Sequence, residues 1–157
     1  MLQVGDKLPT DIELIDHNGQ AVTLAEFLGK YLVIYFYPED DTPGCTVEAC
    51  EFRDFNDEIR KLGAEIIGIS QDDTDSHEKF KEKYKLNFRL LSDPQHIFQE
   101  AVGVWVEKNM FGNKYMGTQR TTFLVDPKGE IVHVWEKVKP EGHALEVLRN
   151  LEVRLKT

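Results

Sequence analysis

The order of strand-like and helix-like segments along the 157 residues predicts an α/β protein, in which helices cover both faces of one mixed central sheet as an α/β/α sandwich. Strands and helices alternate through the middle of the chain, which is typical of parallel strands joined by right-handed crossovers. Near the end, two strand-like segments flank the turn at 126–129 and predict an antiparallel hairpin at one edge. A second pair around the turn at 16–19 predicts an N-terminal hairpin.

The individual elements follow from the hydrophobic pattern and from the residues that end each run. Strands are expected at 11–14, 20–24, 32–36, 64–70, 89–91, 121–125 and 130–135. The run at 32–36 is apolar, aromatic and β-branched, as expected for a strand that is buried on both faces. Helices are expected at 46–62, 74–85, 95–102 and 143–155, and Gly63 ends the first of them. We interpret the segment 108–117, which contains charged residues and glycines, as a mobile loop.

Length and composition exclude several classes of function. A chain of 157 residues suits one domain spanning 1–157, and its net charge of -9 argues against nucleic acid and anionic membranes as partners. The first residues lack the basic start and apolar core of a signal peptide, and the longest apolar run is too short to cross a bilayer. We therefore expect a cytoplasmic protein, in which two cysteines are reactive or inert thiols rather than a permanent disulfide.

Both cysteines lie directly after the predicted central strand. The strand-like run stops at Pro38, and an acidic loop leads to Thr42-Pro43-Gly44-Cys45, which is typical of a helix start. If Thr42 is the N-cap, Pro43 is the first helical residue, where its missing N–H costs nothing. Cys45 then lies in the first turn, where free N–H groups and the positive end of the helix dipole favour an anion. The sequence therefore predicts a reactive thiolate at Cys45.

Cys45 is expected to point inward, because it shares one face, or stripe, of the predicted helix with apolar residues. Residues at 3-4-3-4-3 spacing form one face of the helix: Cys45, Glu48, Phe52, Phe55, Ile59 and Leu62. A carboxylate on a buried face needs a cationic or donor partner. Arg120, which precedes the predicted strand at 121–125, is our candidate, because its guanidinium could bind Glu48 and still offer donors to Cys45. Arg53 is a rival partner for the thiolate, and we interpret it as structural.

Cys50 faces away from this stripe, about 140° around the helix from Cys45. In an intact helix the two Cα atoms would lie roughly 8–9 Å apart, which exceeds the limit of about 7 Å for a disulfide. The two cysteines can therefore bond only if the first turns of the helix unwind. The spacing indicates a redox switch that is helical when reduced and locally unfolded when oxidised.

These residues resemble the peroxiredoxins, specifically the bacterioferritin comigratory protein or peroxiredoxin Q group. The family signature Pro-x-x-x-Thr/Ser-x-x-Cys is present as Pro38, Thr42 and Cys45. The pattern Tyr-Phe-Tyr-Pro-x-Asp-x-Thr-Pro-Gly-Cys-Thr-x-Glu-Ala-Cys-x-Phe-Arg-Asp is matched at 35–54, and Gln-Arg-x-Thr-Phe-Leu-x-Asp at 119–126. The similarity covers essentially the whole chain, with one departure at Val106, where a glycine is common.

The resemblance implies a thioredoxin-like fold and a thiol peroxidase that uses no metal, haem or flavin cofactor. Cys45 would attack the peroxide, and Cys50 would resolve the resulting sulfenic acid as an intramolecular disulfide. Thioredoxin or a similar dithiol protein would then reduce that disulfide. Thr42 would hydrogen-bond the thiolate and the peroxide, Pro38 would shield the site from water, and Arg120 would stabilise the negative charge. The resemblance also implies a monomer, and 108–117 is a candidate contact for the reductase.

Other interpretations of the same residues stay open. A thiol–disulfide oxidoreductase on the same fold is weakened by the absence of a Cys-x-x-Cys motif. A redox-sensing or chaperone-like binding protein could use the same cysteine switch as a signal. The five histidines show no metal-ligand spacing and are expected at the surface or in hairpins, and the acidic run at 39–41 is expected to be a solvated loop.

Overall fold

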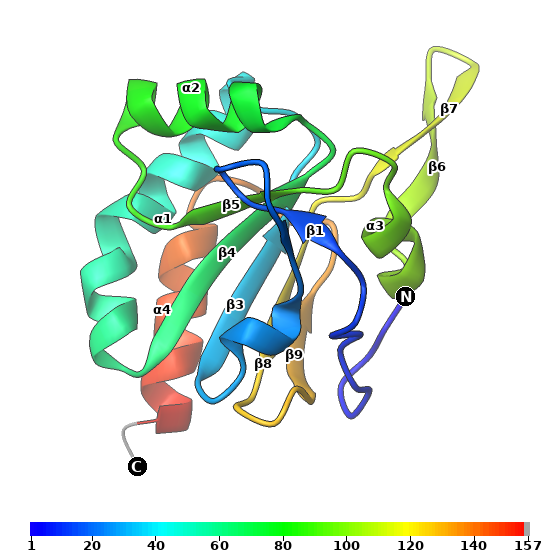
Figure 1. Ribbon diagram of the computed structural model, residues 1–157. Helices are drawn as coiled ribbons and strands as arrows, with labels where there is room; N and C mark the ends of the chain where they lie inside the picture. The colour runs from blue at the N-terminus through cyan, green and yellow to red at the C-terminus, as the bar shows by residue number, and fades with distance from the viewer. Residues whose placement is uncertain (156–157) are drawn as a thin grey trace.

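The computed structural model describes residues 1–155 and contains one seven-stranded sheet with the order β2-β1-β5-β4-β3-β8-β9 (Figure 1). Its strands are β1 (Leu14–Ile15), β2 (Ala21–Val22), β3 (Tyr31–Phe36), β4 (Ala64–Ser70), β5 (Arg89–Ser92), β8 (Thr121–Val125) and β9 (Ile131–Trp135). The helices are α1 (Pro43–Lys61), α2 (Thr74–Tyr84), α3 (Ile97–Val102) and α4 (His143–Leu155), with a 3-10 helix η1 (Leu24–Phe27). The elements alternate as the sequence predicts.

The sheet is mixed. Strands β3, β4 and β5 are parallel at its centre, and β8 pairs antiparallel with β3. The hairpin partner of β8, strand β9, forms one edge, and the N-terminal hairpin of β1 and β2 forms the other. The predicted α/β architecture is therefore confirmed, and β3 lies in the middle of the sheet with α1 directly after it.

Two hydrophobic cores lie on the two faces of this sheet, and β3 contributes to both. Val33 and Tyr35 face the core beneath α1, α2 and α4, whereas Leu32, Ile34 and Phe36 face the core beneath α3 and η1. This alternation explains the continuous apolar run in the sequence, because neither face of the strand meets water.

The predicted bounds differ most in the N-terminal hairpin. Strands β1 and β2 have two residues each, and Leu24 belongs to η1 instead of the second strand. Glu26 causes this difference, since its carboxylate accepts a hydrogen bond from the Thr23 N–H at 3.0 Å and so caps a short helix.

The segment 108–117 is not a loop, and this prediction is wrong. It belongs to a two-stranded ribbon of β6 (Trp105–Met110) and β7 (Asn113–Thr118), which projects from the body of the molecule (Figure 1). Phe111 and Gly112 make the turn with φ of 54° and 84°, as a tight hairpin requires. Both strands are largely exposed, so the sequence lacks the alternation of apolar and polar residues by which a half-buried strand is recognised.

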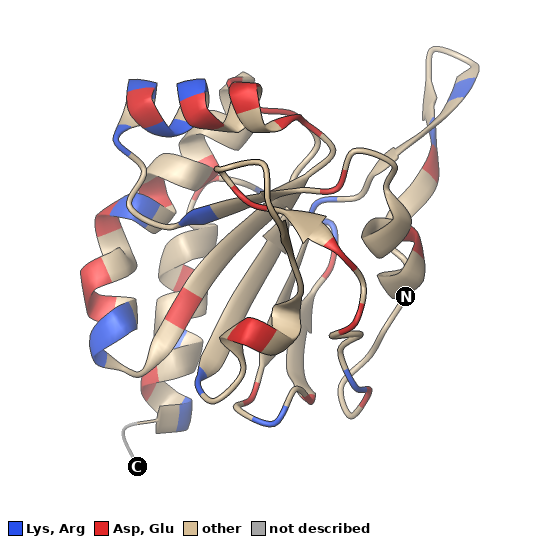
Figure 2. Cartoon of the chain, viewed as in Figure 1, with Lys and Arg blue, Asp and Glu red and all other residues tan. Residues whose placement is uncertain are grey.

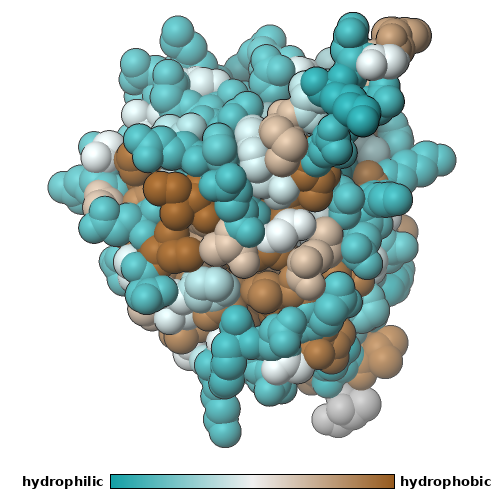
Figure 3. Space-filling model, turned by 90° about the vertical axis from the view of Figure 1, so that its right-hand side faces the viewer, coloured by the Kyte–Doolittle hydropathy of each residue, from teal (hydrophilic) through white to brown (hydrophobic). Residues whose placement is uncertain are grey.

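Charge and hydrophobicity are unevenly distributed over the surface. Acidic and basic residues gather on α1, α2 and the loops, whereas the central strands carry few (Figure 2). One face gathers hydrophobic residues in a patch surrounded by hydrophilic ones (Figure 3). Among residues 1–155, no helix combines the length and the apolar character that a bilayer span requires.

Candidate active site

Cys45 lies at the start of α1, which follows the central strand β3 after a short loop. Thr42 is the N-cap with an extended backbone, and Pro43 is the first helical residue, as the sequence predicts. This makes Cys45 the third residue of the helix, where backbone N–H groups are free to face an anion. The side chain is 2% exposed and carries a free thiol.

Arg120 connects Cys45 to Glu48 through the two arms of its guanidinium. Its Nη2 lies 3.3 Å from the Cys45 Sγ, and its Nη1 donates to the Glu48 Oε1 at 2.7 Å. The arginine precedes β8, and its carbonyl accepts a hydrogen bond from the Val138 N–H at 2.9 Å. The predicted trio of cysteine, glutamate and arginine therefore lies together, with a cation held against the sulfur.

Glu48 is fully buried, and its ion pair is incomplete. Burial raises the pKa of Glu48 to about 7, although Arg120 acts in the opposite direction. The Oε1 atom receives the guanidinium, but Oε2 has no hydrogen-bond partner among residues 1–155. Burial alone would lower the pKa of Arg120, whereas Glu48 and Cys45 together raise it above its ordinary value.

Thr42 and Pro38 lie on the loop that leads from β3 to Cys45, and both are half-buried. The Thr42 hydroxyl donates to the carbonyl of Glu39 at 2.9 Å, so in this state it braces the loop that enters the helix. Its predicted hydrogen bond to the thiolate stays a prediction. Pro38 follows β3 directly and lies on the same loop.

Cys50 lies one and a half turns further along α1 and is half-buried, with a free thiol. The helix is continuous from Pro43 to Lys61, so the two thiols stand on different sides of an intact helix. Arg53 is not the partner of the thiolate. It donates to the carbonyl of Tyr84 at 2.6 Å and pairs with Asp54.

Two predictions about polar residues near the site are wrong. Asp40, in the acidic run that we expect to be solvated, is buried with 8% exposure. His77 and His143, expected at the surface, are also buried, and the His77 Nδ1 lies 2.6 Å from the Asp40 Oδ2. The sequence contains one signal for the burial of His77. It lies three residues before Phe80 on α2, and residues three apart on a helix share a face.

Lys108 is a second cation near the site that the sequence does not single out. It extends from β6, and its Cδ lies 3.4 Å from where a Cβ on Gly117 would stand. Burial lowers the pKa of Lys108, the nearby charge of Arg120 lowers it further, and Cys45 opposes this. The ribbon therefore places a positive charge on the cysteine side of the molecule.

Because Gly44 has no side chain, the Arg120 guanidinium can lie close to the backbone at this position. Gly44→Ala tests this. A Cβ at this position would lie 3.3 Å from the Arg120 Nη2 and 3.4 Å from the Pro140 Cγ. We expect alanine to displace the guanidinium from Cys45 and to slow the reaction with peroxide about tenfold, because this donor acts on the reacting sulfur. The melting temperature should not fall, since alanine favours a helix over glycine by up to about 1 kcal/mol. An unchanged peroxide rate in rapid-mixing experiments would contradict this placement.

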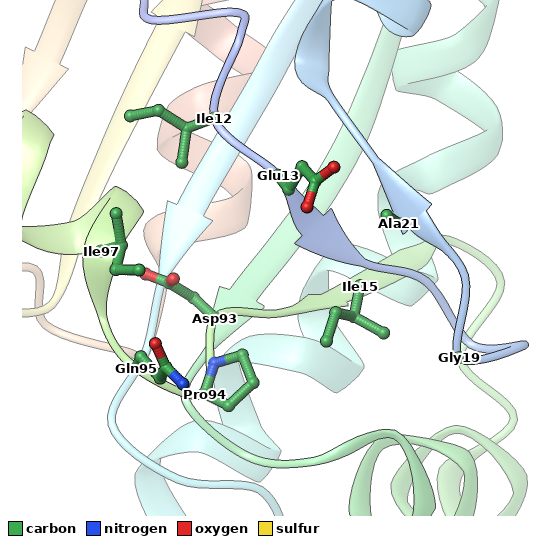
Figure 4. A pocket seen from close by; sticks show the side chains of 9 residues that line it. All are labelled: Ile12, Glu13, Ile15, Gly19, Ala21, Asp93, Pro94, Gln95 and Ile97. Carbon is green, nitrogen blue, oxygen red and sulfur yellow. The ribbon is translucent and has the colours of Figure 1, made fainter.

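A surface hollow elsewhere in the molecule lies between β1, the start of α3 and the turn of the N-terminal hairpin (Figure 4). Its lining includes Asp93, but that carboxylate already accepts hydrogen bonds from the N–H groups of Phe98 and Gln99 at 3.3 and 2.8 Å. The hollow contains neither cysteine and is separate from the candidate active site.

Comparison with known proteins identifies the family. The model of the AhpC/TSA family matches residues 4–134. The chain belongs to this family.

Several relatives are similar over nearly their whole length. The chain is 48% identical to Peroxiredoxin Bcp of Bacillus subtilis, covering 96% of each chain, and 44% identical to Peroxiredoxin Bcp of Escherichia coli, covering 90% of each. Among solved structures, Peroxiredoxin Q of Xanthomonas campestris matches with a TM-score of 0.90 and 41% identity, covering 97% of this chain and 98% of that one. A bacterioferritin comigratory protein of the same organism, described for its alkyl peroxide reduction activity, matches with a TM-score of 0.90 and 40% identity, covering 98% and 99%.

The fold is therefore thioredoxin-like, and the protein is a thiol peroxidase of the peroxiredoxin class. Within that class it groups with the bacterioferritin comigratory, or peroxiredoxin Q, proteins.

Proposed function

We propose that this peroxidase reduces hydrogen peroxide and organic hydroperoxides with Cys45 as the attacking thiolate. The contact of 3.3 Å between the Arg120 Nη2 and the Cys45 Sγ, on a buried side chain in the first turn of α1, carries this proposal. A guanidinium donor beside the sulfur and a place in the first turn of a helix are surroundings typical of reactive cysteines. The same guanidinium would face the oxygen on which negative charge develops as the peroxide bond breaks.

In the first step, an electron pair on the Cys45 sulfur attacks one peroxide oxygen. The S–O bond forms, the O–O bond breaks, and the leaving oxygen takes up a proton to become water or an alcohol. The sulfur is oxidised to a sulfenic acid and the peroxide is reduced. Arg120 would orient the peroxide, Glu48 would hold Arg120, Thr42 would hydrogen-bond the reacting oxygen, and Pro38 would limit access of water.

In the second step, the Cys50 sulfur attacks the Cys45 sulfenic acid. The S–S bond forms, the S–O bond breaks, and hydroxide leaves as water with the proton of the Cys50 thiol. The helix from Pro43 to Lys61 is intact in the reduced state. Its first turns must therefore unwind before the sulfurs can meet, since an intact helix keeps the two Cα atoms roughly 8–9 Å apart. Thioredoxin or a similar dithiol protein would return the enzyme to the thiol state by exchange.

Mass spectrometry after one equivalent of hydrogen peroxide tests this sequence. The parent chain should lose two hydrogens and give a peptide cross-linked between Cys45 and Cys50. Cys50→Ser should instead stop at the sulfenic acid and fail to turn over with thioredoxin. A stable sulfinic acid at Cys45 in the parent would contradict resolution by Cys50.

We also propose that the protein acts as a monomer in the cytoplasm. Two cysteines that cycle between thiol and disulfide suit a reducing compartment. Light scattering of the reduced protein should give the mass of one chain, and a dimer at micromolar concentration would contradict the proposal.

A redox-sensing function would use the same cysteine switch without turnover. Steady consumption of peroxide with a dithiol donor supports the enzyme, whereas one oxidation per chain without recycling supports the sensor.

A further inference from the structure

The loop that leads into α1 is fastened to α2 through one buried aspartate. Asp40 lies between Pro38 and Thr42 and is 8% exposed. Its Oδ1 accepts a hydrogen bond from the Tyr37 hydroxyl at 2.5 Å, and its Oδ2 accepts one from the Ser76 hydroxyl at 2.8 Å. Its backbone N–H donates to the Asp72 Oδ2 at 2.8 Å. The peroxidase mechanism given above uses none of these contacts.

The partner of Asp40 on α2 is His77, which is 1% exposed. Its Nε2 lies 3.2 Å from the carbonyl oxygen of Leu91, and its Nδ1 lies 2.6 Å from the Asp40 Oδ2. Both ring nitrogens therefore lie at hydrogen-bond distance from a partner, and the ring joins the loop before α1 to α2 and β5.

Side-chain donors from two elements surround the Asp40 carboxyl group. The Tyr37 hydroxyl reaches it from the end of β3, and the Ser76 hydroxyl reaches it from α2. Burial raises the pKa of the neighbouring Asp72. The ligand atoms of Asp40, Asp72 and His77 lie within 4.8 Å of one another, but protein groups already hydrogen-bond each residue.

A second set of contacts fastens α1 further along. The Arg53 Nη1 donates to the Tyr84 carbonyl at 2.6 Å, and the Asn56 Nδ2 donates to the Asn87 carbonyl at 2.9 Å. The end of α2 and the loop after it therefore hold α1 beyond Cys50, while Asp40 holds the chain before Cys45. The turns that carry the two cysteines lie between these two anchors.

We propose that Asp40, held by the buried His77, is a positioning residue for the peroxidase reaction. The pair fixes the loop that carries Pro38 and Thr42, and so the placement of Cys45 in the first turn of α1. It acts through this loop and does not touch the reacting atoms.

Asp40→Ala removes every side-chain contact of the anchor and is the first test. We expect the reaction of Cys45 with hydrogen peroxide to slow about tenfold, because a displacement of about 1 Å at a reacting group costs up to about 100-fold. Amide hydrogen exchange over residues 44–50 should speed up about tenfold, since the N-terminal anchor limits opening of these turns. Both rates are measured in the Cys50→Ser background, so that the result does not depend on disulfide formation.

Asp40→Asn should recover most of the peroxide rate, because asparagine keeps the shape of the side chain and can hydrogen-bond Tyr37, Ser76 and His77. His77→Phe keeps an aromatic ring but has no ring nitrogen to hydrogen-bond Asp40. If Asp40→Ala does not fold, His77→Phe is the second test and should show the same slower peroxide reaction and faster exchange.

Asp93→Ala is the matched control, because Asp93 is another buried aspartate and holds two amides of α3 instead. It should lower stability while leaving the peroxide rate and the exchange at 44–50 unchanged. Equal slowing in Asp93→Ala would mean general destabilisation and overturn the proposal. Parental kinetics and exchange in both Asp40→Ala and His77→Phe would overturn it as well.

Discussion

Arg120→Lys is expected to slow the reaction with hydrogen peroxide about 100-fold, as the loss of one fixed donor at a developing charge typically does. The two arms of the guanidinium serve two partners at once, Glu48 at 2.7 Å and the Cys45 sulfur at 3.3 Å. A lysine ammonium is a single point of charge on a flexible stem and cannot keep this planar fork. The buried Glu48 carboxylate competes with the Cys45 sulfur for the lysine ammonium, so the sulfur loses its donor.

Rapid mixing with hydrogen peroxide measures this effect, and Arg53→Lys is the control. Arg53 lies on the same helix as Cys45 but donates to the Tyr84 carbonyl and pairs with Asp54. The control should keep the parental peroxide rate. If Arg120→Lys loses less than about threefold, the contact between the guanidinium and the sulfur contributes little to the reaction.

The core of the site could be predicted from the sequence because it follows the periodicity of one helix. Cys45 and Glu48 share the buried stripe with Phe52, and all three are at most 2% exposed. A carboxylate in that position needs a cation. Arg120 lies 72 residues from Glu48 in sequence, yet it could be nominated because it adjoins a strand with a fully buried pattern.

The buried contacts of Asp40 beside the site could not be predicted, because the residues that make them carry no periodic signal of their own. Asp40 lies in an acidic loop whose composition is typical of solvent exposure, and its burial depends on Tyr37, Ser76 and His77 meeting it from other elements. The ribbon of β6 and β7 was missed for the opposite reason. Its strands are largely exposed on both sides, so backbone pairing holds them together and leaves no hydrophobic alternation.

Glu48→Gln is expected to change both stability and activity in a way that depends on pH. Burial raises the pKa of Glu48 in the folded state to about 7, well above its value in the unfolded chain. Between these two values the unfolded state releases the proton while the folded state keeps it, so this group makes folding less favourable as pH rises. The free energy of unfolding of the parent, relative to that of Glu48→Gln, should fall by about 3 kcal/mol between about pH 4.5 and 7.

The peroxide rate should show the matching pattern, because glutamine resembles the protonated form of Glu48. Above about pH 7 the parent carries an ionised Glu48 that fixes Arg120, and Glu48→Gln should react about tenfold more slowly, as removal of an orienting charge-assisted hydrogen bond predicts. Below about pH 6 the parent holds the proton too, so the two rates should converge. Urea unfolding and rapid mixing from about pH 5 to 8 measure both curves. A rate ratio that stays constant across this range would mean that the charge of Glu48 does not orient Arg120, and that the pair serves only to fill a buried space.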